Sequence, residues 1–252
     1  MRSLRGRTVL VTREEGEDGK LTAALRALGA RVVHVSLLET LPPEDEEPLM
    51  REAGRLGSYD WLLFTSARAV ESLSRFVREN GRRPRVAAVG QGTASSAREA
   101  GFPPEVVGTE GALALVREMT RVDPHLAERS VLAPLAERAQ PDGIRALREA
   151  GARVQVVTAY RTKLREEGLS ELREALRRDT FDAVAFASPS AVEAFASARV
   201  ALSCPLFAIG GTTAQALEDH GFGEAFLPDR PDFAELAELI ARELGSHPER
   251  EA

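Results

Sequence analysis

The sequence predicts an α/β protein with two parallel sheets, each covered by helices. Short apolar runs alternate along the chain with segments that carry apolar residues at helical spacing. Each run has three to five residues rich in Val, Ile, Leu or Phe, as expected of strands buried on both faces. Ten such runs are many for a single sheet, so two sheets of about five strands are favoured. The expected strands are Thr8–Val11, Val32–Val35, Trp61–Phe64, Val86–Val89, Glu105–Val107, Val131–Ala133, Val154–Val157, Ala183–Phe186, Leu206–Ile209 and Ala225–Leu227.

The segments between these runs have the pattern of helices that cover a sheet. Leu21, Leu25 and Leu28 form one apolar stripe, and Gly29 follows as a helix stop. A second stripe ends in the same way at Gly151. Strands that alternate with such helices indicate parallel pairing with crossover connections.

Two polar segments, 36–48 and 158–168, interrupt the alternation. The first contains Pro42 and Pro43 and an acidic run, and the second lacks a clear apolar stripe. We interpret both as linkers between domains, because long irregular loops are uncommon inside a compact domain.

The two halves of the chain resemble each other, which predicts an internal duplication. Several matches lie 122 positions apart: Gly29–Val32 with Gly151–Val154, Asp60 with Asp182, and Ser66 with Ser188. The repeats could stand in tandem or exchange strands, and the positions of the linkers favour exchange. We therefore expect one domain from 1–37 plus 164–252 and another from 40–160, with linkers at 38–39 and 161–163.

Composition excludes several classes of protein. The net charge of −6 argues against a nucleic-acid binder, and no apolar run approaches the ~20 residues of a membrane helix. Cys204 is the only cysteine, and the four histidines share no ligand spacing, so we expect neither a disulfide framework nor a metal site. Residues 1–14 do not read as a signal peptide, so a cytoplasmic monomer without membrane or nucleic-acid partners is expected.

Small, hydroxyl-bearing and basic residues follow the expected strands, where parallel sheets bind ligands. These candidates are Thr12, Arg13, Ser66, Ala67, Arg68, Gly90, Thr93, Ser188, Pro189, Ser190, Gly210, Thr212 and Thr213. A helix that starts at such a turn presents free N–H groups to an anion. The alternative is that these residues only cap helices. Dinucleotide binding is disfavoured, because Ser95 stands where the third glycine of the fingerprint belongs.

Tyr160 is a candidate catalytic residue, because it lies in the second polar segment beside Arg161. A phenol there could donate a proton or a hydrogen bond to a ligand. Packing at a hinge is the alternative role for this ring.

Six segments together resemble the uroporphyrinogen-III synthase family. They are VLVTR (9–13), DWLLFTSARAVESL (60–73), VAAVGQGTASSAREAGF (86–102), AYRT (159–162), FASPSAVEAF (186–195) and FAIGGTTAQALEDHGF (207–222). The resemblance implies two flavodoxin-like domains joined by a two-stranded linker. It also implies closure of hydroxymethylbilane to uroporphyrinogen III in a cleft between the domains, with loss of water, inversion of ring D through a spirocyclic pyrrolenine, and no cofactor.

The resemblance extends to site residues but has one departure. It implies that the candidate turns and Arg161 bind the carboxylates of the substrate, with Tyr160 as the catalytic residue. Where the family often has Arg-Gly after the sixth strand, this chain has Pro134 and Leu135, and Arg138 is the expected substitute. Two other functions stay open at this point: a bilobed cytoplasmic binding or sensor module for a small anion, and a transferase with an anionic donor.

Overall fold

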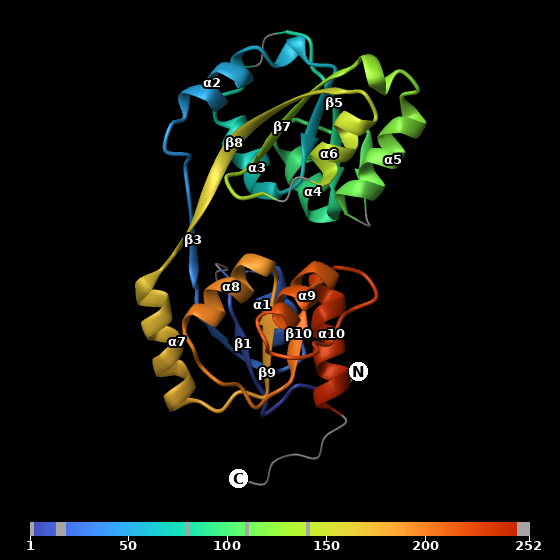
Figure 1. The fold of residues 1–252 in the computed structure, drawn as a ribbon. Helices are drawn as coiled ribbons and strands as arrows, with labels where there is room; N and C mark the ends of the chain where they lie inside the picture. The colour runs from blue at the N-terminus through green and yellow to red at the C-terminus, as the bar shows by residue number, and fades with distance from the viewer. Residues whose placement is uncertain (1–2, 14–18, 79–80, 109–110, 140–141, 246–252) are drawn as a thin grey trace. The chain divides into compact units, whose positions relative to one another are not determined.

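The computed structural model describes residues 3–13, 19–78, 81–108, 111–139 and 142–245. The chain divides into two compact units. Unit 1 is Met1–Glu39 with Lys163–Ala252, and unit 2 is Thr40–Thr162. Two strands, β3 and β8, contain the residues at which the chain passes from one unit to the other (Figure 1). Among the described helices, none is long and apolar enough to cross a membrane.

Unit 1 contains a parallel sheet with the strand order β10-β9-β1-β2. Its strands are β1 (Thr8–Val11), β2 (Arg31–His34), β9 (Ala183–Phe186) and β10 (Leu206–Ala208). A single bridge joins Phe207 to Phe226, where the sequence predicted a further strand over Ala225–Leu227. The order corresponds to 2-1-3-4, the flavodoxin-like winding, because β9 and β10 are the third and fourth strands of this unit.

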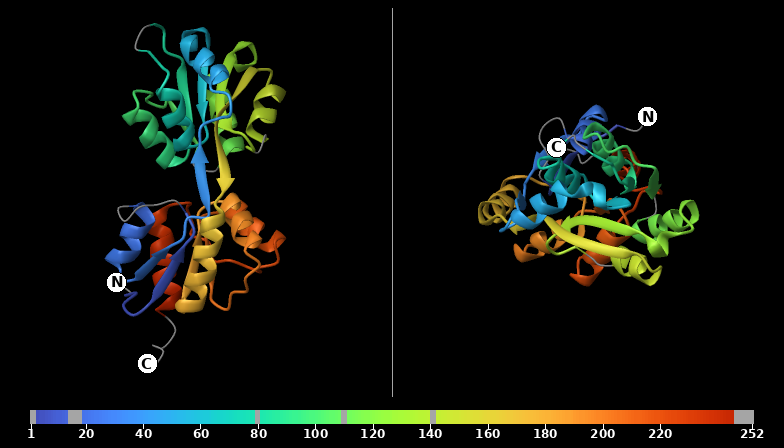
Figure 2. Two further views of the ribbon diagram at one scale, coloured as in Figure 1. Left: turned by 90° about the vertical axis from the view of Figure 1, so that its left-hand side faces the viewer. Right: turned by 90° about the horizontal axis from the view of Figure 1, so that it is seen from above.

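Helices cover both faces of the unit 1 sheet. The helices are α1 (Lys20–Ala27), α7 (Glu166–Arg178), α8 (Pro189–Ser197), α9 (Gly211–Asp219) and α10 (Phe233–Leu244). Val9 and Val11 of β1 pack with α1 and α10, whereas Leu10 packs with α7, α8 and α9. The left view of Figure 2 shows α1 and α10 on one side of these strands and α8 and α9 on the other. Alternate residues of each strand therefore serve two cores, which explains the continuous apolar runs in the sequence.

Unit 2 contains a sheet with the strand order β3-β8-β7-β4-β5-β6. Its strands are β3 (Leu38–Leu41), β4 (Trp61–Phe64), β5 (Arg85–Val89), β6 (Val106–Gly108), β7 (Ser130–Ala136) and β8 (Arg153–Leu164). The pairs from β8 to β6 are parallel. Strand β1 pairs with β9, and β4 pairs with β7, so the strands are exchanged between the two halves of the chain rather than grouped in tandem.

Helices cover both faces of the unit 2 sheet as well. They are α2 (Glu47–Gly54), α3 (Ala67–Ser74), α4 (Gly90–Glu99), α5 (Ala112–Val122) and α6 (Asp142–Glu149), with short 3-10 turns at Leu56–Ser58 and Leu126–Glu128. Leu62 and Phe64 pack with α2, α3 and α4, whereas Trp61 and Leu63 pack with α5 and α6. The apolar residues of the strand thus again alternate between two helical layers.

Two expectations about local structure were wrong: that both polar segments are irregular, and that the sixth strand ends at Ala133. Segments 36–48 and 158–168 are not irregular linkers, since they contain β3, the start of α2, the end of β8 and the start of α7. Strand β7 does not end at Ala133, because Pro134 and Leu135 continue it as buried strand residues. The proline is tolerated because β4 pairs only with the first part of β7, so no ladder partner on that side requires its missing N–H.

Candidate functional site

The residues predicted to bind a ligand lie at the carboxyl edges of the two sheets. In unit 1 they follow β1, β9 and β10, which are neighbours in the sheet. In unit 2 they follow β4, β5 and β7, and Tyr160 and Arg161 lie within β8, the neighbour of β7 in the sheet. Each unit therefore gathers one set of candidate residues at one edge, as parallel topology requires.

Two serines cap helices at these edges. Ser66 Oγ accepts a hydrogen bond from the Ala69 amide at 3.2 Å at the start of α3. Ser188 Oγ accepts one from the Ala191 amide, also at 3.2 Å, at the start of α8. The capping alternative therefore describes one role of these serines. Contact with an anion stays a prediction for both.

The threonines of these turns differ in exposure. Thr12, Thr93 and Thr213 are buried, and Thr12 Oγ1 donates to the Ala185 carbonyl at 3.4 Å. Thr212 is exposed at the start of α9. Only Thr212 thus presents its side chain at the surface, and the buried threonines instead pack the turns into the sheet.

Glycine is required at the first residue of α4. Gly90 has φ +77°, a left-handed conformation that side chains with a Cβ rarely adopt. A Cβ at this position would meet nothing within 4 Å, so the space beside this turn is open. The backbone of this turn is accordingly accessible at the carboxyl edge of β5.

The candidate arginines mostly have partners within the protein. Arg13 stacks over the Phe233 ring at 4.6 Å, and Arg68 pairs with Glu71 at 3.2 Å. Arg161 donates to the Pro42 carbonyl at 3.1 Å and to Glu44 at 2.9 Å. Arg138 is exposed in the turn after β7. Arg161 thereby joins β8 to the segment that follows β3.

Tyr160 lies in β8 rather than in a polar linker, and its hydroxyl contacts Ser66. The two side-chain oxygens are 3.2 Å apart. The ring is partly buried and packs against the core beneath α3. Tyr160 and Ser66 both belong to unit 2, so the carboxyl edge of this unit holds a phenol and a helix cap in direct contact.

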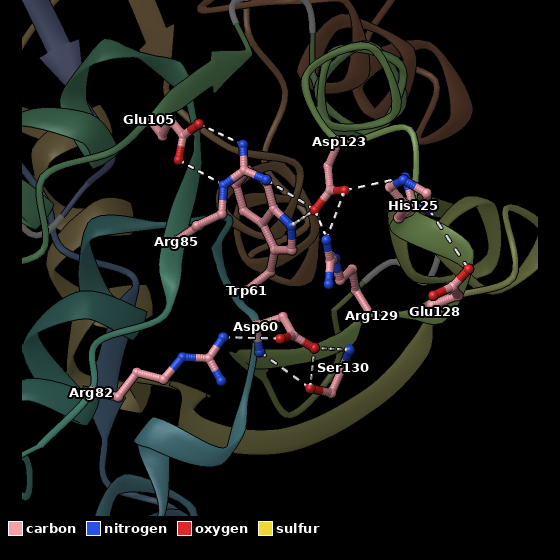
Figure 3. A network of polar contacts seen from close by, with 10 residues as sticks. All are labelled: Asp60, Trp61, Arg82, Arg85, Glu105, Asp123, His125, Glu128, Arg129 and Ser130. Carbon is pink, nitrogen blue, oxygen red and sulfur yellow. Dashed lines mark hydrogen bonds and ion pairs between the residues drawn. The ribbon is translucent and has the colours of Figure 1, made fainter.

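A buried acidic centre that the sequence did not reveal lies at the opposite edge of unit 2 (Figure 3). The Asp123 carboxylate accepts hydrogen bonds from Trp61 Nε1 at 3.1 Å, Arg85 Nη1 at 2.9 Å and Arg129 Nε at 3.0 Å. It also accepts one from the His125 amide at 3.2 Å. Burial raises the pKa of Asp123, but the hydrogen bonds from Arg129 and Trp61 outweigh it and lower the pKa overall.

This centre is structural, because it joins the starts of neighbouring strands. Trp61 begins β4 and Arg85 begins β5, far from the carboxyl edge. Arg85 also donates to Glu105 at 2.8 Å, which lowers the pKa of that carboxyl, and its guanidinium stacks over the Trp61 ring at 4.1 Å. The matches between the two halves of the sequence do not extend to this centre, since Gly245 stands 122 positions after Asp123. No motif therefore marks the centre in the sequence.

Asp60, close to this centre, also joins the starts of two strands. Its carboxylate accepts hydrogen bonds from the Ser130 amide and hydroxyl, both at 2.9 Å, and pairs with Arg82 at 3.1 Å. The Ser130 amide is the main reason why the pKa of Asp60 is lowered. This aspartate thereby ties the start of β4 to the start of β7.

The carboxyl edges hold helix starts and a phenol, which are groups able to contact an anion or donate a proton. Within the described ranges, no group of three or more His, Cys, Asp or Glu side chains could hold a metal ion. The helix starts at Ser66 and Ser188 suit carboxylates, and Tyr160 can serve as a proton or hydrogen-bond donor.

Comparison with known proteins gives a consistent result. The family model described as Uroporphyrinogen-III synthase HemD matches residues 19–242. A uroporphyrinogen-III synthase from Synechococcus elongatus is 30% identical over 201 residues, which cover 75% of this chain and 74% of that protein. A chloroplastic uroporphyrinogen-III synthase from Oryza sativa is 27% identical, covering 95% of this chain and 81% of that protein.

Solved structures of similarly named proteins share the fold. A mutant uroporphyrinogen III synthase from Thermus thermophilus has a TM-score of 0.65 at 23% identity and covers 96% of this chain and 100% of that one. A uroporphyrinogen-III synthetase from Helicobacter pylori has a TM-score of 0.65 at 19% identity, with 92% and 97% covered.

Proposed function

Because the chain belongs to the uroporphyrinogen-III synthase family, we propose that it closes linear hydroxymethylbilane into uroporphyrinogen III. The reaction inverts ring D and releases water, so the enzyme is a lyase. The match of the family model over residues 19–242 carries this proposal. The carboxyl edges support it, because hydroxyls and helix starts suit a substrate with eight carboxylates.

We propose that the protein acts mainly by orienting the substrate. The pyrrole nitrogen expels the hydroxyl readily, so the difficult task is to direct ring D to attack through the correct carbon. Carboxylates held by these turns would fix the linear chain in that geometry. The contributing residues are the candidate turns, with Arg138 and Arg161 as cations. No cofactor takes part.

Tyr160 supplies the proton in this mechanism. The carbon–oxygen bond of the hydroxymethyl group breaks, and the departing oxygen takes the phenolic proton to leave as water. Ring D regains aromaticity by losing the proton of its newly bonded α carbon, and this proton restores the phenol. Because the leaving group departs readily, we expect the contribution to lie at the low end of the 10²–10⁴-fold typical of general acids, about a hundredfold or less.

The two tyrosines of the chain provide a matched test. Tyr160→Phe removes the candidate acid, whereas Tyr59→Phe removes a buried hydroxyl that contacts Glu52 and Arg55 near the amino edge of unit 2. Freshly generated hydroxymethylbilane is supplied, and isomers I and III are resolved by chromatography after oxidation. Tyr160→Phe should slow formation of isomer III and allow the spontaneous isomer I to appear. Tyr59→Phe should lower the melting temperature but keep the rate.

The outcome also separates the enzyme from a binding module. A wild-type protein that binds uroporphyrinogen III yet yields only isomer I, at the rate of free substrate, would be a binder of tetrapyrroles. Wild-type turnover in Tyr160→Phe would instead leave Tyr160 as a packing residue, and positional control would account for the whole mechanism.

We also propose that the chain arose by duplication, followed by exchange of strands between the repeats. The strand registers support this history: Val9 pairs with Val32 in unit 1, and Val131 pairs with Val154 in unit 2, each 122 positions later. The links between strand starts recur as well. The Asp182 carboxylate accepts from the Thr8 amide at 2.9 Å, as the Asp60 carboxylate does from the Ser130 amide.

The remaining expectations are proposals of the same kind. The residues near 38–39 and 161–163 link the two units, and the enzyme works as a cytoplasmic monomer with the tetrapyrrole as its partner. Gel filtration with light scattering tests the monomer, and a mass near twice 27.3 kDa would contradict it.

A further inference from the structure

We infer that Ser66 is a positioning residue for Tyr160: its hydroxyl donates to the phenol oxygen and leaves the phenolic proton directed at the substrate. The inference rests on the proposed function, since it assigns Ser66 a part in the same reaction. It concerns the direction of one hydrogen bond, between two oxygens that lie 3.2 Å apart.

The hydrogen bonds available to Ser66 favour this direction. A serine hydroxyl has one proton to donate and two lone pairs that accept. One lone pair of Ser66 Oγ accepts the Ala69 amide at 3.2 Å, which ties the oxygen to the start of α3. The hydroxyl proton is then free to point at Tyr160. Donation to the phenol oxygen satisfies Ser66 and leaves the proton of Tyr160 for another acceptor.

The backbone of β8 brings the phenol to this helix. Leu135 of β7 is opposite Thr158, but the next residue, Ala136, is opposite Tyr160, so Ala159 is an extra residue in the register. Without this irregularity, alternation would place Tyr160 on the face opposite to Ala159. Instead both pack with the core beneath α3. Register shifts of this kind redirect side chains, often next to active sites.

The other half of the chain has the same cap without the phenol. Ser188 Oγ accepts the Ala191 amide at the same 3.2 Å, but its neighbour is Ser190 Oγ at 3.1 Å. The position 122 residues before Tyr160 is Leu38. Capping of the helix therefore does not itself require a tyrosine, and the contact with Tyr160 is a distinct feature of unit 2. Ser188 is accordingly the matched control for Ser66.

Four substitutions at these serines separate the cap from the hydrogen bond. Ser66→Ala removes both, and Ser66→Thr retains both. Ser66→Asp retains a good cap, but an ionised carboxylate only accepts, so it would draw the phenolic proton toward itself. Ser188→Ala removes a cap that has no phenol. The rate is measured as kcat at saturation, because an added aspartate also repels a carboxylate-rich substrate and raises KM.

The expected rates follow from this scheme. Ser66→Ala and Ser66→Asp should lower kcat for isomer III by roughly threefold to tenfold, a fraction of what a general acid supplies. Ser66→Thr should restore kcat. In a Tyr160→Phe background Ser66→Ala should have no further effect on kcat, whereas Ser188→Ala should have the same effect in both backgrounds. An unchanged kcat in Ser66→Ala would overturn the inference, because the contact would then not position the phenol. A higher kcat would overturn it too, because the phenol would then be donating to Ser66 in the wild-type protein.

A spectroscopic measurement tests the contact independently of activity. Tyrosine labelled with ¹³C at Cζ gives two signals in this chain, and Tyr160→Phe identifies that of Tyr160. Ser66→Ala and Ser66→Asp should shift this signal, whereas Ser66→Thr and Ser188→Ala should leave it in place. A Tyr160 signal unmoved by Ser66→Ala would refute the hydrogen bond. If the wild-type protein fails to make isomer III, the proposed function fails, but this measurement still decides whether Ser66 positions the phenol.

Discussion

Removal of the Asp123 charge should destabilise unit 2 substantially and leave the residues at its carboxyl edge in place. In Asp123→Asn the buried carboxylate, 4% exposed, becomes an amide that cannot neutralise Arg85 and Arg129. Breaking a buried ion pair costs about 3–5 kcal/mol when both partners are inaccessible. Here the two arginines are 34% and 36% exposed and recover some hydration, so about 2–3 kcal/mol is expected.

The chain contains its own probe for this measurement. Trp61 is the only tryptophan, is fully buried, and donates to Asp123, so its fluorescence reports the unfolding of unit 2. With a guanidinium dependence of about 4 kcal/mol per molar, the midpoint should fall by about 0.5–0.75 M. The control is Asp142→Asn, which removes an exposed carboxylate paired with Arg145 at 2.9 Å and should change stability by less than about 0.5 kcal/mol.

The stability of the folded protein should also depend on acid pH through the Asp123 carboxylate. The pKa of Asp123 in the folded protein lies below the ordinary 3.8, so its contribution to stability is complete at neutral pH. That contribution is lost as pH falls below about 4 and through the folded pKa. Wild-type stability should therefore fall more steeply with acid than that of Asp123→Asn. The variant keeps a residual slope, because the pKa values of Asp60 and Glu105 are also lowered. Equal midpoints for Asp123→Asn and Asp142→Asn would refute this account.

Further outcomes are expected for stability and for substrate binding. Gly168→Ala should lower the stability by several kcal/mol, because the new Cβ would overlap the Ser36 carbonyl oxygen. Gly92→Ala should raise the stability by about 0.5–1 kcal/mol, because the new Cβ would meet no atom within 4 Å; similar melting temperatures for the two variants would contradict this. The KM for hydroxymethylbilane should rise with salt, because salt screens the contacts with its carboxylates. Alanine at Thr212 or Ser190 should lower turnover only modestly, because each contact at a helix start is worth about 0.3–2 kcal/mol. Complete loss of activity in one such folded variant would contradict the idea that many contacts share the binding of the substrate.

The positions of most strands could be predicted from the sequence. Runs such as Trp61–Phe64 and Ala183–Phe186 are apolar throughout because both of their faces are covered by helices, and the structure has strands with the same bounds. Segments 36–48 and 158–168 gave no such signal. Strand β3 and the end of β8 are half-exposed and mix apolar with polar residues, so neither apolar periodicity nor a stop signal distinguishes them from loops.

The sequence also predicted which edge of each sheet holds the candidate residues, but not their contacts. Residues after parallel strands lie at one edge of their sheet, which places Ser66 at the edge of unit 2 and Ser188 at the edge of unit 1. Whether the side chain of a threonine such as Thr213 is buried or exposed depends on how the turn packs against the sheet. That choice is made by packing, which no local pattern records.

What the sequence by itself determined is therefore the α/β class, the alternation of strands and helices, and the family. These follow from periodicity and residue order along the chain. Only the tertiary structure decided that Tyr160 meets Ser66 and that Asp123 gathers Trp61, Arg85 and Arg129. The first contact depends on one extra residue in the register of β8, and the second joins side chains up to 68 positions apart. Both arise from how strands are aligned in space, which is set by packing of the whole sheet.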